Sequence, residues 1–319
     1  MKSLKVLLAT PRGFCAGVDR AVLVVDRALE LFGRPVYVRG QIVHNRHVVA
    51  NLARHGALFV SDLDQVPDGG TVIFSAHGVA PDVRAKAIAR RLNWIDATCP
   101  LVSKVHQEVR RFSKDDRPIV LIGENGHDEV IGTMGEAPGR VHLVSNSEEA
   151  AAVQFAHAEA PAVLTQTTLS IDDTKEIIDK LKGRFPTLLL PPHEDICFAM
   201  QNRQKAVRRI SVEADLIIIL GSRNSHNANQ LKQVAESTGV RTYLIDDVTE
   251  LNYEWLQATR CIGISAGAST PESLVEELVN YLGSVTEIQV KLVEGTSERM
   301  VFALPAQLMG QHRSFSAKI

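Results

Sequence analysis

Short runs of apolar residues recur along this 319-residue chain, separated by longer segments with helical periodicity. The runs are continuous rather than alternating, which is typical of strands buried on both faces of a sheet. The clearest are KVLLA (5–9), TVIFSA (71–76), PIVLIG (118–123), AVLTQ (162–166), LIIIL (216–220) and CIGIS (261–265). Between them, the periodicity predicts helices such as 19–33, ending at Gly33, and 270–283, ending at Gly283. Strands that alternate with helices predict βαβ units and parallel sheets, and therefore an α/β fold.

Three of the four cysteines share one local setting. Cys15, Cys99 and Cys197 each follow a strand or loop and precede an amphipathic helix, at intervals about the size of a small α/β domain. We therefore expect three domains that each deliver one cysteine to a common point. The helix dipole and the free backbone N–H groups are expected to lower the pKa of each thiol and favour the metal-binding thiolate. The fourth cysteine, Cys261, lies inside an apolar run and is expected in the core.

The spacing of the cysteines does not determine which metal ion or cluster three converging thiolates would bind. Zinc usually takes close pairs such as CxxC, which the chain lacks, and a structural zinc site needs a fourth ligand. A 4Fe-4S cluster held by three thiolates leaves one iron open for a substrate. Alternatively, each cysteine is a buried apolar residue, because free cysteine is among the most buried residue types.

A second group of polar residues follows the strands, at the sheet edge where α/β proteins place ligand sites. His44, His77 and His127 each come after an apolar strand, and Glu129 follows His127. The segments 221–231 and 264–274 place Ser, Asn and Thr before helices, a composition that suits an anion. Ser269 or Thr270 is alternatively the N-cap of the next helix. The chain has neither GxxxxGK[ST] nor GxGxxG after a strand, which excludes the usual nucleotide and nicotinamide sites.

Composition narrows the class of protein further. The chain is 45% hydrophobic, and no apolar run approaches the roughly 18 residues of a membrane span, so we expect a globular protein without a membrane partner. The N-terminus has no cleavage site after its short apolar run, which favours a cytoplasmic location, where disulfides are rare. A net charge of -2, scattered Lys and Arg, and an aromatic content of 5% argue against nucleic-acid binding.

A series of stretches between residues 11 and 271 resembles the 4-hydroxy-3-methylbut-2-enyl diphosphate reductase (LytB/IspH) family. In chain order they are PRGFCAGVDRA, IVHN, FSAHGV, DATCPLV, GHDEVIGTMG, TQTTLSIDDT, DICFAMQNRQ, NSHNAN and GISAGASTP. The resemblance implies three small α/β domains with mainly parallel sheets, arranged pseudo-threefold around a central iron–sulfur cluster. We expect these domains at 1–98, 99–196 and 197–283. A C-terminal segment, 284–319, would return to the core and end in a loosely held extension.

The resemblance also implies an activity. The family reduces (E)-4-hydroxy-3-methylbut-2-enyl diphosphate to isopentenyl and dimethylallyl diphosphate with two electrons and loss of water, the last step of the non-mevalonate isoprenoid route. By motif, Cys15, Cys99 and Cys197 would hold one 4Fe-4S cluster per chain with one iron not bound by protein. Glu129, with a raised pKa, and Thr167 would relay a proton to the departing hydroxyl, beside His127. The diphosphate would be bound by His44, His77, His127, Ser225, His226, Asn227 and Ser269. Electrons would come from a ferredoxin or flavodoxin, because the chain carries no flavin or nicotinamide motif.

Two residues depart from the family pattern: His226 stands where a serine is usual, and Asp128 stands where a proline is common. Two rival interpretations also remain at this point. Quinolinate synthase likewise uses three cysteines from three related domains, and a regulatory protein could keep a cluster as a sensor. The paired GHDEV and TQTTLS motifs argue against the former. Glu129, an acid without an evident structural task, argues against the latter.

Overall fold

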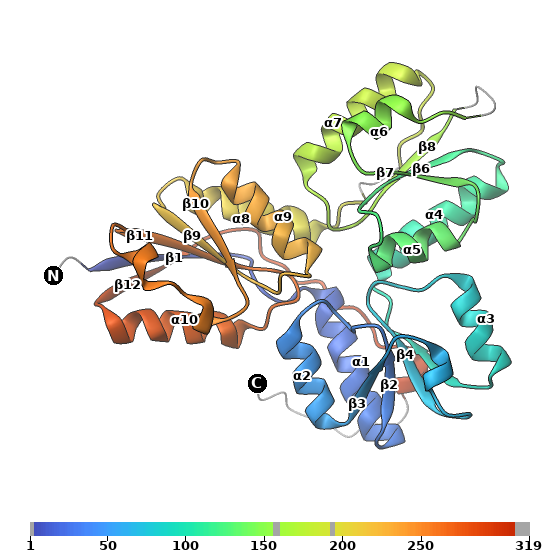
Figure 1. Cartoon of the computed structure of the whole chain (residues 1–319), viewed down its shortest axis with the longest axis horizontal. Coiled ribbons are helices and arrows are strands. Elements are labelled where there is room, and N and C mark those ends of the chain that lie inside the picture. The colour runs from blue at the N-terminus through green and yellow to red at the C-terminus, as the bar shows by residue number, and fades with distance from the viewer. Residues whose placement is uncertain (1–2, 156–159, 192–194, 310–319) are drawn as a thin grey trace.

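The computed structural model describes residues 3–155, 160–191 and 195–309. In these ranges strands and helices alternate and form three lobes that meet at a common centre (Figure 1). Each lobe has its own sheet, and the strand pairs in all three are parallel. The expected three small α/β domains with mainly parallel sheets are therefore confirmed. No helix within the described ranges is long and apolar enough to cross a lipid bilayer.

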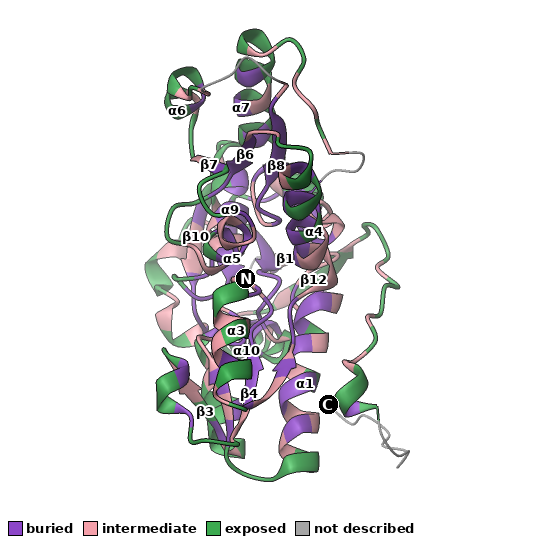
Figure 2. Ribbon diagram, turned by 90° about the vertical axis from the view of Figure 1, so that its right-hand side faces the viewer, coloured by how far each residue is buried: buried purple, intermediate pink, exposed green. Residues whose placement is uncertain are grey.

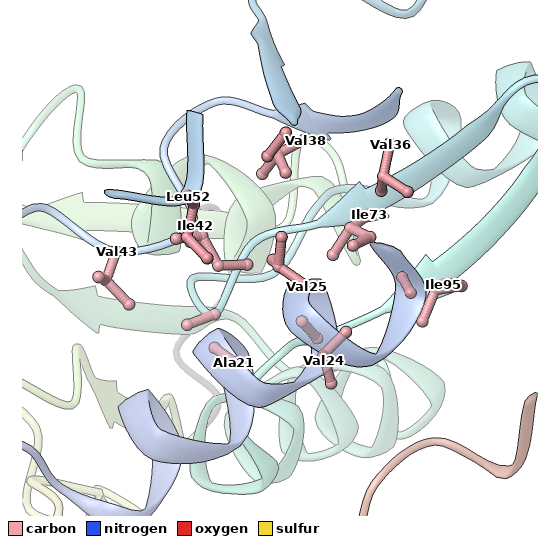
Figure 3. Close-up of a cluster of buried hydrophobic side chains, with 14 of the residues drawn as sticks. Ala21, Val24, Val25, Val36, Val38, Ile42, Val43, Leu52, Ile73 and Ile95 are labelled. Carbon is pink, nitrogen blue, oxygen red and sulfur yellow. The ribbon is translucent and has the colours of Figure 1, made fainter. Parts of the chain in front are cut away.

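The first lobe is a four-stranded sheet in the order β3-β2-β4-β5 with helices packed on it. Its elements are α1 (Ala16–Phe32), β2 (Val36–Arg39), α2 (Arg46–His55), β3 (Ala57–Val60), β4 (Thr71–Phe74), α3 (Pro81–Ala89) and β5 (Asn93–Asp96). Helix α1 buries Ala21, Val24 and Val25 against the apolar face of this sheet, as Figure 3 shows. It ends at Gly33 as expected, because Gly33 takes a φ of 76° that stops the helix.

The second lobe has a three-stranded sheet in the order β7-β6-β8. Its elements are α4 (Pro100–Lys114), β6 (Ile119–Ile122), α5 (Asp128–Gly135), β7 (Val141–Val144), α6 (Ser147–Ala152), β8 (Ala162–Thr165) and α7 (Ile171–Arg184). Strands β6 and β8 are buried at every position, which explains why their sequences are continuously apolar. Figure 2 shows these buried strands inside more exposed helices.

The third lobe has a five-stranded sheet in the order β10-β9-β11-β1-β12. Its elements are β1 (Leu4–Ala9), α8 (Phe198–Ser211), β9 (Leu216–Leu220), α9 (His226–Glu236), β10 (Arg241–Ile245), β11 (Cys261–Ala266), α10 (Glu272–Val285) and β12 (Ile288–Val293). Cys261 is buried in the apolar cluster between this sheet and α8, which confirms its expected place in the core.

The first strand of the chain lies in this third lobe, whereas the expected boundaries grouped it with residues 1–98. Strand β1 pairs with β11 on one side and β12 on the other, so it is an inner strand of the sheet. An apolar run shows that a strand is buried but not which sheet it joins, because that choice depends on distant partners. Residues 310–319, the expected loosely held end, lie outside the described residues.

Helix α10 differs from the expected element at both ends. It begins after Pro271, so neither Ser269 nor Thr270 is its N-cap. It continues past Gly283 to Val285, because Gly283 keeps a helical backbone instead of a positive φ. A Cβ at Gly283 would lie 3.4 Å from the Ile288 side chain, an ordinary van der Waals distance, so contact with β12 does not require a glycine here.

Candidate active site

Three cysteines from different parts of the chain line one pocket where the three lobes meet. Cys15, Cys99 and Cys197 are the N-cap residues of α1, α4 and α8, and all three thiols are free of disulfides. A Cβ placed on Gly17 would lie 2.7 Å from the Cys99 sulfur and 3.8 Å from the Cys15 sulfur. The structure therefore brings two of the sulfurs together beside the first turn of α1. The Cys99 sulfur occupies space that a side chain at position 17 would fill, so only glycine fits there.

The helix N-termini do not activate these thiols in the way the sequence suggests. The N–H groups of Leu101 and Val102 bond to the Cys99 sulfur, and the Met200 N–H donates to the Cys197 sulfur over 3.4 Å. Burial nevertheless raises the pKa of Cys99 to about 12 and raises that of Cys197 well above its usual range. The expected lowering of the pKa is wrong for these two thiols, because removing a thiolate from water costs more than the backbone N–H groups return.

A buried arginine that sequence reasoning missed holds the loop before Cys15. The Arg203 side chain is fully buried; its Nε and Nη2 donate to the Gly13 carbonyl over 3.0 and 2.7 Å, and Nη2 also donates to the Phe14 carbonyl over 3.0 Å. Its Nη1 pairs with Glu298 over 3.1 Å. The signal was present, since Arg203 occupies a position of the apolar stripe that also contains Met200 and Val207.

Among the described residues of the pocket wall, Glu129 is the one acid, and Thr167 holds it through two hydrogen bonds. Glu129 as a whole is 2% exposed; its Oε1 accepts from the Thr167 N–H over 2.7 Å, and its Oε2 accepts from the Thr167 hydroxyl over 3.1 Å. Burial raises the pKa of Glu129 to about 7, even though both bonds from Thr167 act in the opposite direction. At neutral pH this carboxyl group can therefore hold or release a proton.

Three histidines from the first two lobes pack against one another on the same wall. The His44 and His77 rings are stacked with centroids 4.1 Å apart, and His127 meets them edge-on at 5.5 and 5.6 Å. Burial lowers the pKa of His44, holds that of His77 well below its usual range and lowers that of His127 to about 3. The rings are therefore neutral. In His127, Nδ1 accepts from the Glu129 N–H over 3.1 Å, so the proton is on Nε2.

The third lobe completes the pocket wall with polar side chains, each of which makes hydrogen bonds within the protein. His226 places Nδ1 3.0 Å from the Thr168 hydroxyl and Nε2 3.3 Å from a Glu124 carboxylate oxygen. Asn227 accepts from the Ala268 N–H over 2.7 Å, and the Ser269 hydroxyl donates to the His44 carbonyl over 3.1 Å.

Of the expected diphosphate-binding residues, only Ser225 is absent from the described pocket wall. It is fully buried, and its hydroxyl accepts from the Asn227 side-chain amide over 2.7 Å. In this structure Ser225 therefore orients Asn227 from behind.

Thr168 and Phe302 are among the wall residues that were not predicted as site residues from the sequence. Thr168 directly follows Thr167 in the TQTTLS motif, so this motif was the sequence signal that could have identified it. Phe302 comes from the segment after β12, whose Ala303 carbonyl accepts from Arg20 Nε over 2.7 Å. The start of the tail, MVFALP (300–305), resembles the Phe–Pro closing segment of the family, but only the path of this segment across the molecule places Phe302 on the pocket wall.

The described wall combines three thiols, one titratable acid and four histidines, and includes no lysine or arginine. Thiols can hold a metal centre, the acid can exchange a proton near neutral pH, and the imidazoles can bond to a polar ligand. The pocket is therefore suited to metal-dependent acid–base chemistry on a small molecule.

Comparison with known proteins gives consistent matches. Residues 6–283 match the family described as LytB protein. The chain is 52% identical to the 4-hydroxy-3-methylbut-2-enyl diphosphate reductase of Acidothermus cellulolyticus, over 95% of this chain and 90% of that protein. It is 48% identical to the enzyme of the same name from Streptomyces coelicolor, over 99% of this chain and 94% of that protein.

A solved structure is also similar over almost its whole length. The E-1-hydroxy-2-methyl-but-2-enyl-4-diphosphate reductase from Plasmodium falciparum superposes with a TM-score of 0.92 at 39% sequence identity. The match covers 96% of this chain and 97% of that one. Both the sequence and the arrangement of the three lobes are therefore shared with proteins of this name.

Proposed function

This chain belongs to the LytB protein family, and from that premise we propose that it reduces (E)-4-hydroxy-3-methylbut-2-enyl diphosphate. The products would be isopentenyl and dimethylallyl diphosphate, as the last step of the non-mevalonate isoprenoid route. The supporting observation is that three thiols, the Glu129–Thr167 pair and a group of histidines line the same pocket. Neither a quinolinate synthase nor a sensor is favoured by this combination, and the relatives named above are reductases.

The three cysteines fit a cluster better than a single metal ion. On one zinc ion, Zn–S bonds of about 2.3 Å in a tetrahedron put the sulfurs roughly 4 Å apart. Among the described residues, only His44, His77 and Asp128 place three ligand atoms within 4.8 Å of one another, so the three sulfurs are spread more widely. We propose that Cys15, Cys99 and Cys197 bind a 4Fe-4S cluster with one iron not bound by protein. When bound, this group supplies electrons and a Lewis-acidic iron.

Gly17 provides a test of this fit. Alanine normally favours a helix over glycine by about 1 kcal/mol, but a Cβ at Gly17 would lie 2.7 Å from the Cys99 sulfur. We expect Gly17→Ala to displace that sulfur, an overpacking that costs about 1–3 kcal/mol, and to lower the iron bound per chain after anaerobic reconstitution. Gly183→Ala is the matched control, because that helical glycine has open space around it. Full iron content in Gly17→Ala would contradict the proposed position of the cluster.

The proposed reaction balances as one substrate, two electrons and two protons giving one product and one water. Glu129 is the group suited to protonate the departing hydroxyl, which leaves as water while the second proton goes to carbon. Thr167 fixes the carboxyl group through two hydrogen bonds. Protonation at either end of an allylic system would give the two products from one pocket.

The diphosphate would be bound by neutral donors. His127 presents a protonated Nε2, and His44, His77, His226, Asn227 and Ser269 share the wall with it, while Ser225 orients Asn227. Electrons would come from a ferredoxin or flavodoxin, since the sequence carries no flavin or nicotinamide motif. The cytoplasmic location expected from the sequence stays a prediction.

The experiment that tests the activity is anaerobic. Cluster-loaded protein, reduced methyl viologen and the hydroxylated allylic diphosphate are mixed, and viologen oxidation is followed by absorbance. We expect oxidation that depends on the substrate, with both isoprenoid diphosphates as products. Protein that carries iron and sulfide but gives no substrate-dependent oxidation would refute the proposed substrate.

A further inference from the structure

An irregular segment of the chain passes the cysteine pocket on the outside of the molecule. We call residues 294–303 the crossing segment; they follow β12 and precede the short helix at Ala306–Leu308. Figure 2 shows a mostly exposed stretch of chain between β12 and the C-terminal end. A segment without regular structure can present side chains to a partner when the elements beneath it hold it in place.

Helix α8 holds the first half of the crossing segment. A Cβ at Gly295 would lie 3.0 Å from Arg209 Nη1, so the two residues are close. Three positions later, the Glu298 carboxylate accepts from Asn202 Nδ2 over 2.9 Å. Since Arg209 is near the end of α8 and Asn202 near its start, the segment runs against the direction of the helix, toward the N-cap residue Cys197.

The second half of the crossing segment reaches from α8 to α1. The Ala303 carbonyl accepts from Arg20 Nε, on the second turn of α1, over 2.7 Å. Residues 299–302 therefore span from the first turns of α8 to those of α1, the helices that begin after Cys197 and Cys15. This short stretch thus passes directly beside two of the three pocket cysteines.

Two consecutive apolar residues of this stretch are exposed to solvent. Met300 is 53% exposed and Val301 is 87% exposed, whereas the next residue, Phe302, lines the pocket. A single exposed apolar side chain is ordinary on a protein surface. Here, however, two of them adjoin a residue of the pocket wall. A partner that covers this pair would therefore lie one residue away from the pocket.

The charge around this apolar pair is positive, although the whole chain has a net charge of -2. The exposed cations are Lys205, Arg209 and Arg299, and among the described residues none of them has an ion-pair partner. The two on α8 lie three and seven positions after Asn202, hence on the helix face that the crossing segment follows. The nearby acids Glu298 and Asp19 both interact with the buried Arg203, which leaves Glu294 as the uncompensated acid of the segment. An acidic partner is therefore the one that this surface suits.

We propose that the crossing segment and the adjoining face of α8 form the docking surface for the electron donor, a small acidic protein with its redox cofactor near its surface. The inference rests on the proposed function for the need of a donor. Acidic side chains of the donor would pair with the three cations, around an apolar contact on Met300 and Val301. A small apolar centre with a charged rim is typical of weak, transient redox complexes. The donor is oxidised by one electron at each encounter, so two encounters supply the two electrons of the proposed reaction.

The test compares two sources of electrons for the same cluster-loaded protein. Reduced methyl viologen is a small molecule that needs no docking surface, whereas reduced flavodoxin and ferredoxin are acidic proteins that do. Arg299→Glu and Val301→Asp are each expected to lower kcat/KM for the protein donors about 10-fold, the lower end of the 10- to 1,000-fold effect of electrostatic steering on association rates. Turnover driven by viologen should be unchanged. Both side chains are exposed, so neither change disturbs the packing of the protein.

Each variant has a matched control on the same molecule. Lys114→Glu makes the same reversal of charge as Arg299→Glu, but at the end of α4 opposite Cys99. Val212→Asp makes the same change as Val301→Asp, but at the end of α8 opposite Cys197, where Val212 is 84% exposed. Both controls should keep the wild-type kcat/KM with the protein donors.

Binding of the donor gives a readout besides activity. Oxidised flavodoxin is titrated into cluster-loaded protein by calorimetry, and the Kd should rise in Arg299→Glu. In the wild type the Kd should also rise with ionic strength, because salt screens exposed charges.

Several results would overturn the docking surface while the viologen-driven reductase activity stands. These are no turnover of the wild type with either protein donor, unchanged kcat/KM in Arg299→Glu and Val301→Asp, or equal losses in these variants with protein donors and with viologen. A lower mass of Val301→Asp in light scattering would show that a second copy of the chain occupies the surface instead. Conversely, flavodoxin binding that depends on Arg299, in a protein that oxidises no viologen with the substrate, would refute the proposed function alone.

Discussion

Replacing Glu129 by glutamine is expected to lower kcat by about 100- to 10,000-fold, the range that a positioned general acid contributes. Glutamine keeps the shape of the side chain. Its amide oxygen can still accept from the Thr167 N–H, which bonds to Glu129 Oε1 over 2.7 Å, and its NH2 group can donate to the Thr167 hydroxyl oxygen, which lies 3.1 Å from Glu129 Oε2. It cannot give up a proton to a departing hydroxyl. The measurement is steady-state viologen oxidation, with iron and sulfide counted in the same sample to establish that the cluster is present.

Glu124→Gln is the matched control for this change. Glu124 lies on the loop between β6 and α5, whereas Glu129 lies on the first turn of α5; Glu124 is more than half exposed and pairs with His226 rather than Thr167. It should keep the kcat of the wild type within a few-fold. Near-normal turnover in Glu129→Gln would remove Glu129 from the mechanism, and equal losses in both variants would point to an unspecific effect of charge.

The pH profile gives the Glu129 prediction a second readout. Burial raises the pKa of this carboxyl group to about 7, so the proton-donating form dominates below that pH and is lost above it. Wild-type kcat should therefore fall as the pH rises through 7, and the residual activity of Glu129→Gln should lack this decline.

The raised pKa of Glu129 also affects the stability of the protein. Unfolded protein releases this proton near pH 4.5, so the wild-type free energy of unfolding should fall between pH 4.5 and 7 relative to the variant.

Changing any one of the three pocket cysteines to serine is expected to remove most of the iron and sulfide, and with it the activity. A serine hydroxyl is far less acidic than a thiol and is a poor ligand for iron, so two remaining thiolates would hold the cluster weakly. The measurement is iron and sulfide per chain after anaerobic reconstitution of Cys15→Ser, Cys99→Ser and Cys197→Ser.

Cys261→Ala is the control for these three variants. Cys261 is buried in strand β11 within an apolar cluster, away from the pocket wall, so alanine leaves a small void and should retain iron and sulfide. Full metal content in any pocket variant, or its loss in Cys261→Ala, would contradict the ligand assignment.

Reconstitution of the wild type with iron and sulfide should also become more efficient as the pH rises. Burial raises the pKa of the Cys99 and Cys197 thiols, and these must lose their protons to bind metal.

Much of the fold was predictable because its signals are local. Strands such as β6, β8 and β9 are buried at every position, so their apolar runs are visible without a partner. The three cysteines precede amphipathic helices, and in the structure they are the N-caps of those helices. Motifs that surround the polar residues carried the family resemblance. These features depend on a few neighbouring residues, which is the distance over which a sequence pattern is informative.

Features that depend on distant contacts were decided only by the tertiary structure. Strand β1 belongs to the third lobe because it pairs with β11 and β12, and these partners lie more than 250 positions further along the chain. Burial determined the protonation of the Cys99 and Cys197 thiols against the local helix effect. Only folding placed Asp128 beside His44 and His77. The burial of a side chain and the identity of its neighbours depend on how the three lobes pack together. The sequence therefore identified the chemical groups of the site, and the fold determined their protonation and which of them lie in contact.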